Sequence, residues 1–192
     1  MGVETKQRIV GAGAELFRRQ GYTGTGIKQI VAEANAPFGS LYHFFPGGKE
    51  QLAGEVIRWS GAMYAEMVTG VIASAGDPLQ LVEIFFSGAA EHLRETGYED
   101  ACPIATVALE VASTSEPLRV ATAEVFDSWI EGLAARLEVS GLPGQVSREI
   151  SIAMLIALEG AFVLSRAKRS TEPLEVAGRA MTEVVRNALS RC

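Results

Sequence analysis

Residues 38–49, FGSLYHFFPGGK, bring together side chains that can hydrogen-bond to phosphate oxygens and to base edges. Tyr42 carries a phenolic hydroxyl, His43 carries an imidazole, and the last residue of the run is a lysine. Gly39 and Ser40 are small enough to let a helix approach another molecule closely. Without further context, Tyr42 and His43 are better explained as ordinary surface residues of a short helix. The pattern therefore indicates binding chemistry only if the neighbouring elements present it outward.

Two short helices must position these side chains. Apolar residues recur every three or four positions over residues 27–34, which predicts an amphipathic helix. Pro37 ends that helix, because the residue before a proline is pushed out of the helical region. A second helix is predicted over residues 38–44, with Leu41 and Phe45 pointing inward. Two short helices across a tight turn form a helix-turn-helix, whose second helix can lie in the DNA major groove.

The run FGSLYHFFPGGKEQL resembles the recognition-helix signature of TetR-type bacterial transcriptional regulators. With the amphipathic helix before it, the resemblance covers about the first third of the chain. The Pro-Gly-Gly-Lys-Glu form at residues 46–50 and the Cys-Pro-Ile-Ala-Thr run at residues 102–106 resemble the multidrug-type branch that includes the lincomycin-resistance repressors. The resemblance implies a DNA-binding head, a ligand-responsive body and a roughly palindromic double-stranded DNA operator.

The resemblance also implies which residues contact DNA. Thr25 is expected to cap the first helix of the motif and to touch the DNA backbone with Lys28. Phe38 departs from the family pattern, which often has a lysine or a polar residue there; its ring can contact a thymine methyl or pack on the head. The expected DNA-contacting residues are Thr25, Lys28, Phe38, Gly39, Ser40, Tyr42, His43 and Lys49.

The charge distribution supports a nucleic-acid-facing head on an acidic body. The chain has 192 residues and a net charge of −6, which alone argues against a nucleic-acid binder. Residues 1–58 nevertheless hold seven Lys and Arg against five acids, whereas the remainder carries −8. Such asymmetry fits a basic head, and its small positive charge predicts modest non-specific affinity.

Composition and motifs exclude several other classes. Two cysteines 90 positions apart do not form a disulfide framework, and the N-terminus has no apolar signal region. The most apolar run, residues 152–164, is too short to span a membrane. We therefore expect a soluble cytoplasmic protein without membrane contact. Gly47-Gly48-Lys49-Glu50 is not a phosphate-binding loop, and no nucleophile elbow or metal motif is present, so no cofactor, metal or enzyme activity is expected.

The chain is predicted to be all-α with about nine helices and no strands. We predict a head over residues 1–46 for DNA binding and a body over residues 47–192 for ligand binding and dimerisation. Glycines at positions 11 and 13 predict close packing of the first helix on its neighbours. The expected helices cover about residues 4–20, 27–34, 38–44, 49–74, 78–96, 103–112, 116–139, 147–169 and 173 onward.

Aromatic and methionine side chains of the body can together line an adaptable apolar pocket, although each is individually better explained by an ordinary core. His92 is a candidate polar anchor or a helix-end histidine. Glu159 must find water, a partner or a cationic ligand group, and Cys102 is a pocket-mouth or core residue. We expect a small hydrophobic effector, flat or cationic. The candidate ligand-binding residues are Trp59, Met63, Met67, Phe86, His92, Cys102, Ile104, Val107, Phe126, Trp129, Met154, Leu158, Glu159 and Phe162.

The two C-terminal helices carry more apolar faces than the core of one chain needs. A large exposed apolar surface marks an interface, and two-fold pairing would form a four-helix bundle in a homodimer. The candidate dimer-interface residues are Ile152, Leu155, Ile156, Val163, Val176, Met181, Val184 and Val185.

Three functions compete at this point. The first is a DNA-binding regulator, most readily a repressor released from its operator by a small apolar or cationic ligand. The second is a small-molecule-binding protein with weakened DNA binding, which Phe38 and the weak positive charge make conceivable. The third is an all-α enzyme, for which the sequence shows no motif. Binding to the DNA that flanks its own gene separates the first two.

Overall fold

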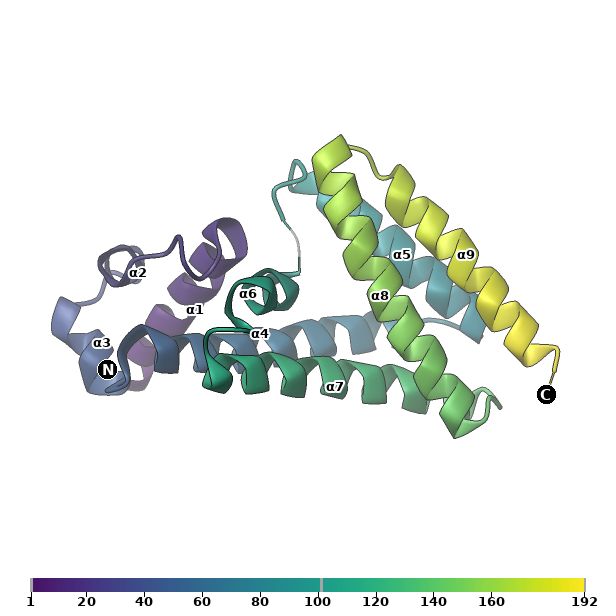
Figure 1. Ribbon diagram of the computed structural model, residues 1–192, viewed down its shortest axis with the longest axis horizontal. Coiled ribbons are helices and arrows are strands. Elements are labelled where there is room, and N and C mark those ends of the chain that lie inside the picture. The colour runs from purple at the N-terminus through teal and green to yellow at the C-terminus, as the bar shows by residue number, and fades with distance from the viewer. Residues whose placement is uncertain (1, 101, 192) are drawn as a thin grey trace. The chain divides into compact units, whose positions relative to one another are not determined.

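A computed structural model describes residues 2–100 and 102–191, apart from the side chains of residues 71–73. Over these residues the chain forms nine helices and no strand (Figure 1), so the predicted all-α fold is confirmed. The helices are α1 (Gly2–Gln20), α2 (Ile27–Glu33), α3 (Phe38–Phe44), α4 (Gly48–Ala73), α5 (Pro78–Glu95), α6 (Pro103–Val111), α7 (Glu116–Val139), α8 (Gly144–Lys168) and α9 (Glu172–Leu189).

The helices pack into two units. The first unit comprises Met1–Met63 and Cys102–Val125, and the second comprises Tyr64–Ala101 and Phe126–Cys192. Helices α4 and α7 each contribute one part to both units. The predicted head of residues 1–46 therefore packs as part of a larger unit that also includes α6. The functional division at residue 46 remains a prediction.

Two of the expected helix starts are built as the sequence indicates. The Asp77 carboxylate accepts hydrogen bonds from the backbone N–H groups of Leu79 and Gln80, at 2.8 and 2.9 Å, and so caps α5. The Ser115 hydroxyl accepts from the backbone N–H of Leu118 at 3.3 Å, at the start of α7. Both caps satisfy donors that a helix end otherwise leaves without partners.

The expected start of α8 is wrong by three residues. The helix begins at Gly144, after Pro143 in an extended conformation, whereas the sequence placed its start at Ser147. Ser147 is buried one turn inside the helix, and its hydroxyl donates to the carbonyl oxygen of Leu142 at 3.4 Å. A serine at an apparent helix start resembles a cap, but here tertiary burial explains it.

Glycines allow close helix contacts in the first unit. A Cβ at Gly13 would lie 3.0 Å from Cγ2 of Val56, so α1 approaches α4 closely, as expected. The same expectation is wrong for Gly11, where a Cβ would meet nothing within 4 Å. A Cβ at Gly61 would lie 2.5 Å from Cγ1 of Val125, so the crossing of α4 and α7 depends on the missing side chain.

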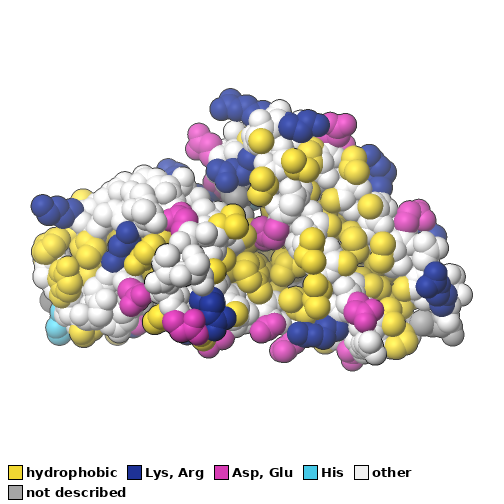
Figure 2. Space-filling view, viewed as in Figure 1, with side chains coloured by type: hydrophobic (Ala, Val, Ile, Leu, Met, Phe, Trp, Pro, Cys, Tyr) yellow, Lys and Arg dark blue, Asp and Glu magenta, His cyan; other side chains and the backbone are white. Residues whose placement is uncertain are grey.

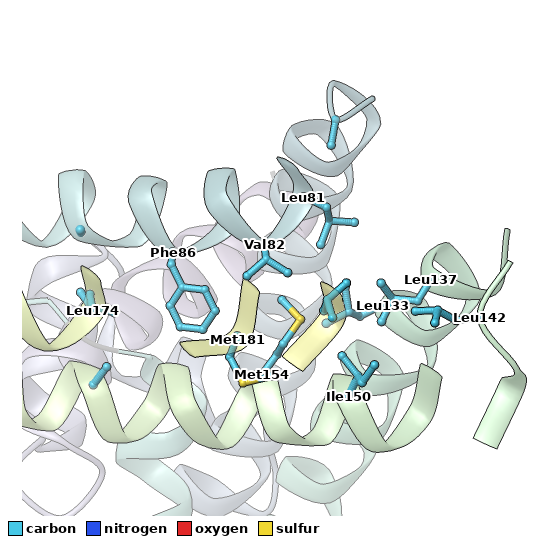
Figure 3. Close-up of a cluster of buried hydrophobic side chains, with 14 of the residues drawn as sticks. Leu81, Val82, Phe86, Leu133, Leu137, Leu142, Ile150, Met154, Leu174 and Met181 are labelled. Carbon is cyan, nitrogen blue, oxygen red and sulfur yellow. The ribbon is translucent and has the colours of Figure 1, made fainter. Parts of the chain in front are cut away.

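The second unit is built around an apolar core (Figure 3). Helix α9 packs against both α5 and α8. Phe86 and Val82 of α5 point toward Met154 of α8 and Met181 of α9. The crossing of α5 and α9 is tight, because a Cβ on the α9 residue Gly178 would lie 2.9 Å from Cβ of Phe86.

Helix α8 combines length with an apolar surface. By length and composition alone it could cross a membrane, yet only 28% of its most apolar window is buried. Ile150, Met154 and Ala161 fill the core of the second unit, whereas Ile156 and Val163 face outward. The helix therefore has more apolar surface than this core uses.

Candidate nucleic-acid interface

Helices α2 and α3 form a helix-turn-helix that α1 holds in place. In the turn, Asn35 adopts a left-handed conformation with φ of +46°, and the backbone N–H of Ala36 donates to the carbonyl oxygen of Val31 at 2.9 Å. The Arg8 side chain of α1 donates from Nε to the carbonyl oxygen of Ala34 at 3.1 Å. This cation satisfies a carbonyl at the C-terminal end of α2, where a positive charge is favourable.

One face of α3 is anchored and the opposite face is exposed. Leu41 and the following Phe45 are fully buried, which confirms the predicted inward direction. The exposed face consists of residues separated by one helical turn and their neighbours: Phe38, Gly39, Tyr42 and His43. The second helix of a helix-turn-helix uses such a face to contact base edges.

The rings of Phe38 and Tyr42 contact each other on this exposed face. Their centroids lie 6.0 Å apart with the planes inclined at 61°, an edge-to-face arrangement that aromatic pairs prefer. Tyr42 in turn lies beside the start of α4, where a Cβ at Gly48 would be 3.6 Å from Tyr42 Cε1. Gly48 has a φ of +66°, a conformation that favours glycine.

Thr25 does not act as the expected helix cap. The N-cap of α2 is Gly26, which has no side chain to accept a hydrogen bond. The Thr25 side chain is only 1% exposed, and its hydroxyl donates to the carbonyl oxygen of Gly21 at 2.7 Å. Its role is thus to close the loop between α1 and α2. The predicted DNA contact of Thr25 is not supported by this geometry.

The two expected lysines differ in setting. Lys28 is exposed on α2. Lys49 is partly buried, with its ammonium 4.2 Å from the centroid of the Tyr22 ring, a cation–π geometry. Desolvation lowers the pKa of Lys49 below its ordinary value, and the nearby charge of Glu110 partly opposes that shift. Lys49 is therefore an oriented cation at the start of α4.

Glu110 of α6 is a contact that the sequence did not reveal. One carboxylate oxygen accepts the backbone N–H of Thr23 at 2.6 Å, in the loop between α1 and α2. The carboxylate occupies the space that a side chain at Gly21 would need. Residues 87 positions apart carry no shared periodicity, so only the folded chain shows this link. Arg8 and Tyr22 were missed for the same reason.

The predicted ligand-binding residues divide between the two units. In the first unit, Cys102, Ile104 and Val107 are buried, and the Cys102 thiol accepts the backbone N–H of Ala105 at 3.4 Å. Trp59 and Met63, also of the first unit, are exposed on α4.

The remaining candidates belong to the second unit. Phe86 and Met154 fill its apolar core, so the ordinary-core interpretation holds for these two (Figure 3). His92 is exposed, and its Nε2 lies 3.5 Å from the Asp100 carboxylate. Met67 is exposed, whereas the partly buried members are Phe126, Trp129, Leu158, Glu159 and Phe162.

Four of the eight predicted dimer-interface residues are exposed, namely Ile156, Val163, Val176 and Val184, and two need correction. Met181 and Val185 are buried in the core of the second unit, because their face of α9 packs inside the chain, so neither can contact a partner directly. Leu164, missing from the prediction, is exposed. Ile152 and Leu155 are partly buried. The large exposed apolar residues of α8 and α9, which we call the apolar stripe, are Ile156, Val163, Leu164, Val176 and Val184. Figure 2 shows hydrophobic side chains at the surface over α8.

Comparisons with known proteins agree with this geometry. Residues 9–56 match the bacterial regulatory proteins of the tetR family, and residues 78–180 match the C-terminal domain of LmrA/YxaF-like transcriptional regulators. The HTH-type transcriptional regulator YxaF of Bacillus subtilis (strain 168) is 32% identical over 183 residues, covering 95% of this chain and 96% of YxaF. LmrA of the same organism is 32% identical over 171 residues, covering 89% and 91%.

Solved structures share the fold. The reduced form of E. coli NemR superposes with a TM-score of 0.79 at 24% identity, covering 92% of this chain and 94% of NemR. A TetR-family regulator from Cytophaga hutchinsonii gives a TM-score of 0.82 at 19% identity, covering 97% and 96%. The relatives are named as transcriptional regulators rather than enzymes.

The resemblance seen in the recognition helix is thus confirmed along nearly the whole chain. Regulators of this type bind operator DNA and act as dimers. The chain belongs to the TetR family of bacterial transcriptional regulators, in its LmrA/YxaF-like branch.

Proposed function

We propose that this regulator is a repressor that binds its operator through the exposed face of α3 and is released by a small apolar or cationic ligand. The observation that supports DNA binding is that α3 has one buried face and one exposed face. Leu41, together with Phe45 directly after the helix, anchors α3 in the head, while Phe38, Tyr42 and His43 face solvent. This arrangement holds the helix rigidly and offers hydroxyl, imidazole and aromatic groups to a groove.

Gly39 provides a sharp test of that face. A Cβ at Gly39 would meet nothing within 4 Å in the protein, so Gly39→Ala has no clash in the free fold. If Gly39 is where α3 approaches the bases, the added methyl separates the two surfaces. We expect Gly39→Ala to weaken binding to the DNA upstream of the gene by about tenfold or more, measured by fluorescence anisotropy. The free energy of unfolding should stay level or rise, because alanine favours helix.

The matched control is Gly11→Ala in α1, where a Cβ also meets nothing within 4 Å. It should gain the same helix propensity and keep wild-type affinity for DNA. Wild-type affinity in Gly39→Ala would contradict the docking of this face.

Repression is proposed from relatives and from the general logic of ligand control. NemR of E. coli, 25% identical over 182 residues, is named a transcriptional repressor. A ligand can release the operator only by its differential affinity for two states of the protein. Loss of operator binding on adding the ligand, together with higher reporter expression, is the expected result. Tighter binding with ligand would instead indicate a corepressor.

The chemistry of the effector is inferred from side chains on α4. Trp59 and Met63, both of the first unit, are four residues apart, so they lie on one face of the helix, and both are about half exposed. Methionine and aromatic side chains adapt to varied apolar ligands, and aromatic faces attract cations. We therefore propose a flat hydrophobic or cationic compound rather than a sugar or nucleotide.

Tryptophan fluorescence tests this proposal directly. Hydrophobic drugs and dyes should change the emission and release operator DNA over the same concentration range. Trp129→Phe separates the signal of Trp129 from that of Trp59. A screen in which no apolar compound changes either signal would favour a regulator without a small hydrophobic effector.

A second candidate function has one specific observation in its favour. Helix α3 carries no Lys or Arg, and the first 58 residues have a net charge of only +2. This favours a ligand-binding protein whose DNA affinity has weakened. Ligand binding without any shift of the DNA flanking its own gene would support that alternative.

For the dimer, we propose that the apolar stripe forms its interface. The proposed interface includes the exposed Leu164 and the partly buried Ile152 and Leu155. Pairing α8 and α9 with the same helices of a second copy removes these side chains from water and places two α3 helices on one operator.

A further inference from the structure

Helix α3 lacks the side chains that usually read bases by paired hydrogen bonds. Its seven residues, FGSLYHF, include no Arg or Lys for guanine and no Asn or Gln for adenine. The polar groups that remain are hydroxyls and one imidazole. Direct recognition by this helix must therefore depend more than usual on the shape and apolar features of the base pairs.

Phe38 is the apolar group placed to make such a contact. It is the first residue of α3, and in a helix-turn-helix the N-terminal residues of the second helix contact base edges. Its side chain is 49% exposed, so the ring is not packed away in the head. The exposed apolar feature of the major groove is the 5-methyl group of thymine, and phenylalanine is among its known apolar partners.

The Phe38 ring is also held in position. Tyr42 lies one turn further along α3 and contacts the Phe38 ring at its edge, with 6.0 Å between centroids. Tyr42 itself rests beside Gly48. A ring that is already oriented loses little side-chain freedom on binding, so the contact adds to affinity efficiently. Gly39, beside Phe38, has no side chain that would keep the helix away from the base.

We propose that Phe38 reads the 5-methyl group of a thymine in each half-site of the operator. The proposal rests on the proposed docking of α3 in the major groove. It makes Phe38 a residue that determines sequence specificity through van der Waals contact. The position that departs from the lysine or polar residue of the family pattern then contributes to the choice of operator.

The test replaces thymine by uracil, which removes only the methyl group and keeps every hydrogen-bonding group. A duplex is first selected by the wild-type protein from a random pool, then resynthesised with deoxyuridine at each thymine in turn. We expect one thymine per half-site at which the change weakens wild-type binding about fourfold, the effect of losing one buried methyl contact. Replacing both half-sites together should weaken binding by roughly the product, about fifteenfold.

Variants of Phe38 assign the effect to its ring. Phe38→Ala should bind the thymine and uracil duplexes with equal affinity, and Phe38→Leu should keep part of the preference. Leu109→Ala, which shortens an exposed side chain on α6, is the control and should keep the full preference. Low salt keeps the weaker complexes measurable without changing the comparison. If that thymine is replaced by 5-methylcytosine or by cytosine, the wild-type protein should bind the duplex with 5-methylcytosine better than the duplex with cytosine.

The outcomes distinguish a failure of the proposed DNA binding from a failure of the methyl contact alone. Failure to enrich any duplex would overturn the proposed DNA-binding function together with this inference. An enriched duplex whose thymines all tolerate uracil would overturn only the methyl contact. A uracil effect of the same size in Phe38→Ala would do the same, because another residue would then read the methyl.

Discussion

Two groups of exposed apolar side chains, one on α3 and one on α8 and α9, differ in size and surroundings. On α3, the pair Phe38 and Tyr42 stands beside polar groups and two small residues. On α8 and α9, the apolar stripe presents five aliphatic side chains, with Ile156 at 68% and Val163 at 62% exposure. The first, which we call the aromatic spot, consists of Phe38 and Tyr42 on a helix of seven residues. The second extends over two long helices.

The difference in size indicates a difference in partner. A small aromatic spot next to hydrogen-bonding groups suits base edges, where one methyl group at a time is contacted. An extended aliphatic surface suits a protein partner, since exposed apolar patches mark interfaces and a two-fold axis lets one surface serve both copies. Under the two proposals, the surface on α3 serves specificity and the apolar stripe serves assembly.

The largest expected effect comes from charging the stripe. Ile156→Asp combined with Val163→Asp would bury four carboxylates in a dimer without partners, which is strongly unfavourable. We expect the dimer dissociation constant to rise by at least a thousandfold, measured by sedimentation at micromolar concentration. Operator affinity should fall with it, because a monomer contacts one half-site. Val139→Asp, at another exposed valine on α7, should leave the dimer intact. A double variant that stays dimeric would move the interface elsewhere.

A smaller effect is expected from the glycine that supports the stripe. Gly178 lies on α9 between Val176 and Val184, where a Cβ would be 2.9 Å from Cβ of Phe86. That neighbouring atom is next to the backbone and cannot rotate away. We therefore expect Gly178→Ala to lower the free energy of unfolding by about 1–3 kcal/mol, measured by urea denaturation.

Gly88→Ala on α5 is the matched control for Gly178→Ala. A Cβ at Gly88 meets nothing within 4 Å, so this change should be neutral or stabilising. Equal unfolding free energies for the two variants would show that α9 can shift without cost. The close packing of α9 against α5 would then not hold the stripe in place.

Local patterns predicted most of the fold, because each helix shows its own spacing, caps and breaks. The predicted helix start at residue 78 is confirmed, with Asp77 as its cap. The same local reasoning misplaced the start of α8 and the cap at Thr25, since a buried serine and a buried threonine resemble caps. Spacing also showed which α3 residues face outward, because Leu41 and Phe45 had to be buried.

Which side chains of the long helices are exposed and which are buried was harder to predict. Helix α9 is apolar on two sides, and spacing alone did not tell Val184, which is exposed, from Val185, which is buried. Similarly, Phe86 and Met154 are of residue types that can line a ligand pocket, but both lie in the apolar core. Contacts between distant segments, such as Glu110 with Thr23, require the folded chain.

The smallest expected effect concerns that last contact, which supports the spot rather than the stripe. The Glu110 carboxylate accepts the Thr23 backbone N–H at 2.6 Å near the surface. Glu110→Ala removes the acceptor, and we expect a loss of about 1 kcal/mol in the free energy of unfolding. Glu110→Gln keeps an acceptor oxygen and should cost about half as much.

Amide hydrogen exchange locates this effect in the molecule. Without the carboxylate, the Thr23 amide should exchange faster because its N–H loses its hydrogen bond, while amides of α9 should keep their wild-type rates. Glu131→Gln, at an exposed acid on α7, serves as the control. Unchanged Thr23 exchange in Glu110→Ala would show that the other contacts of the loop between α1 and α2, such as Thr25 with Gly21 and Lys49 with Tyr22, are sufficient to hold it. Faster exchange at Thr23 together with weaker operator binding would instead show that DNA binding by α3 depends on polar support from α6.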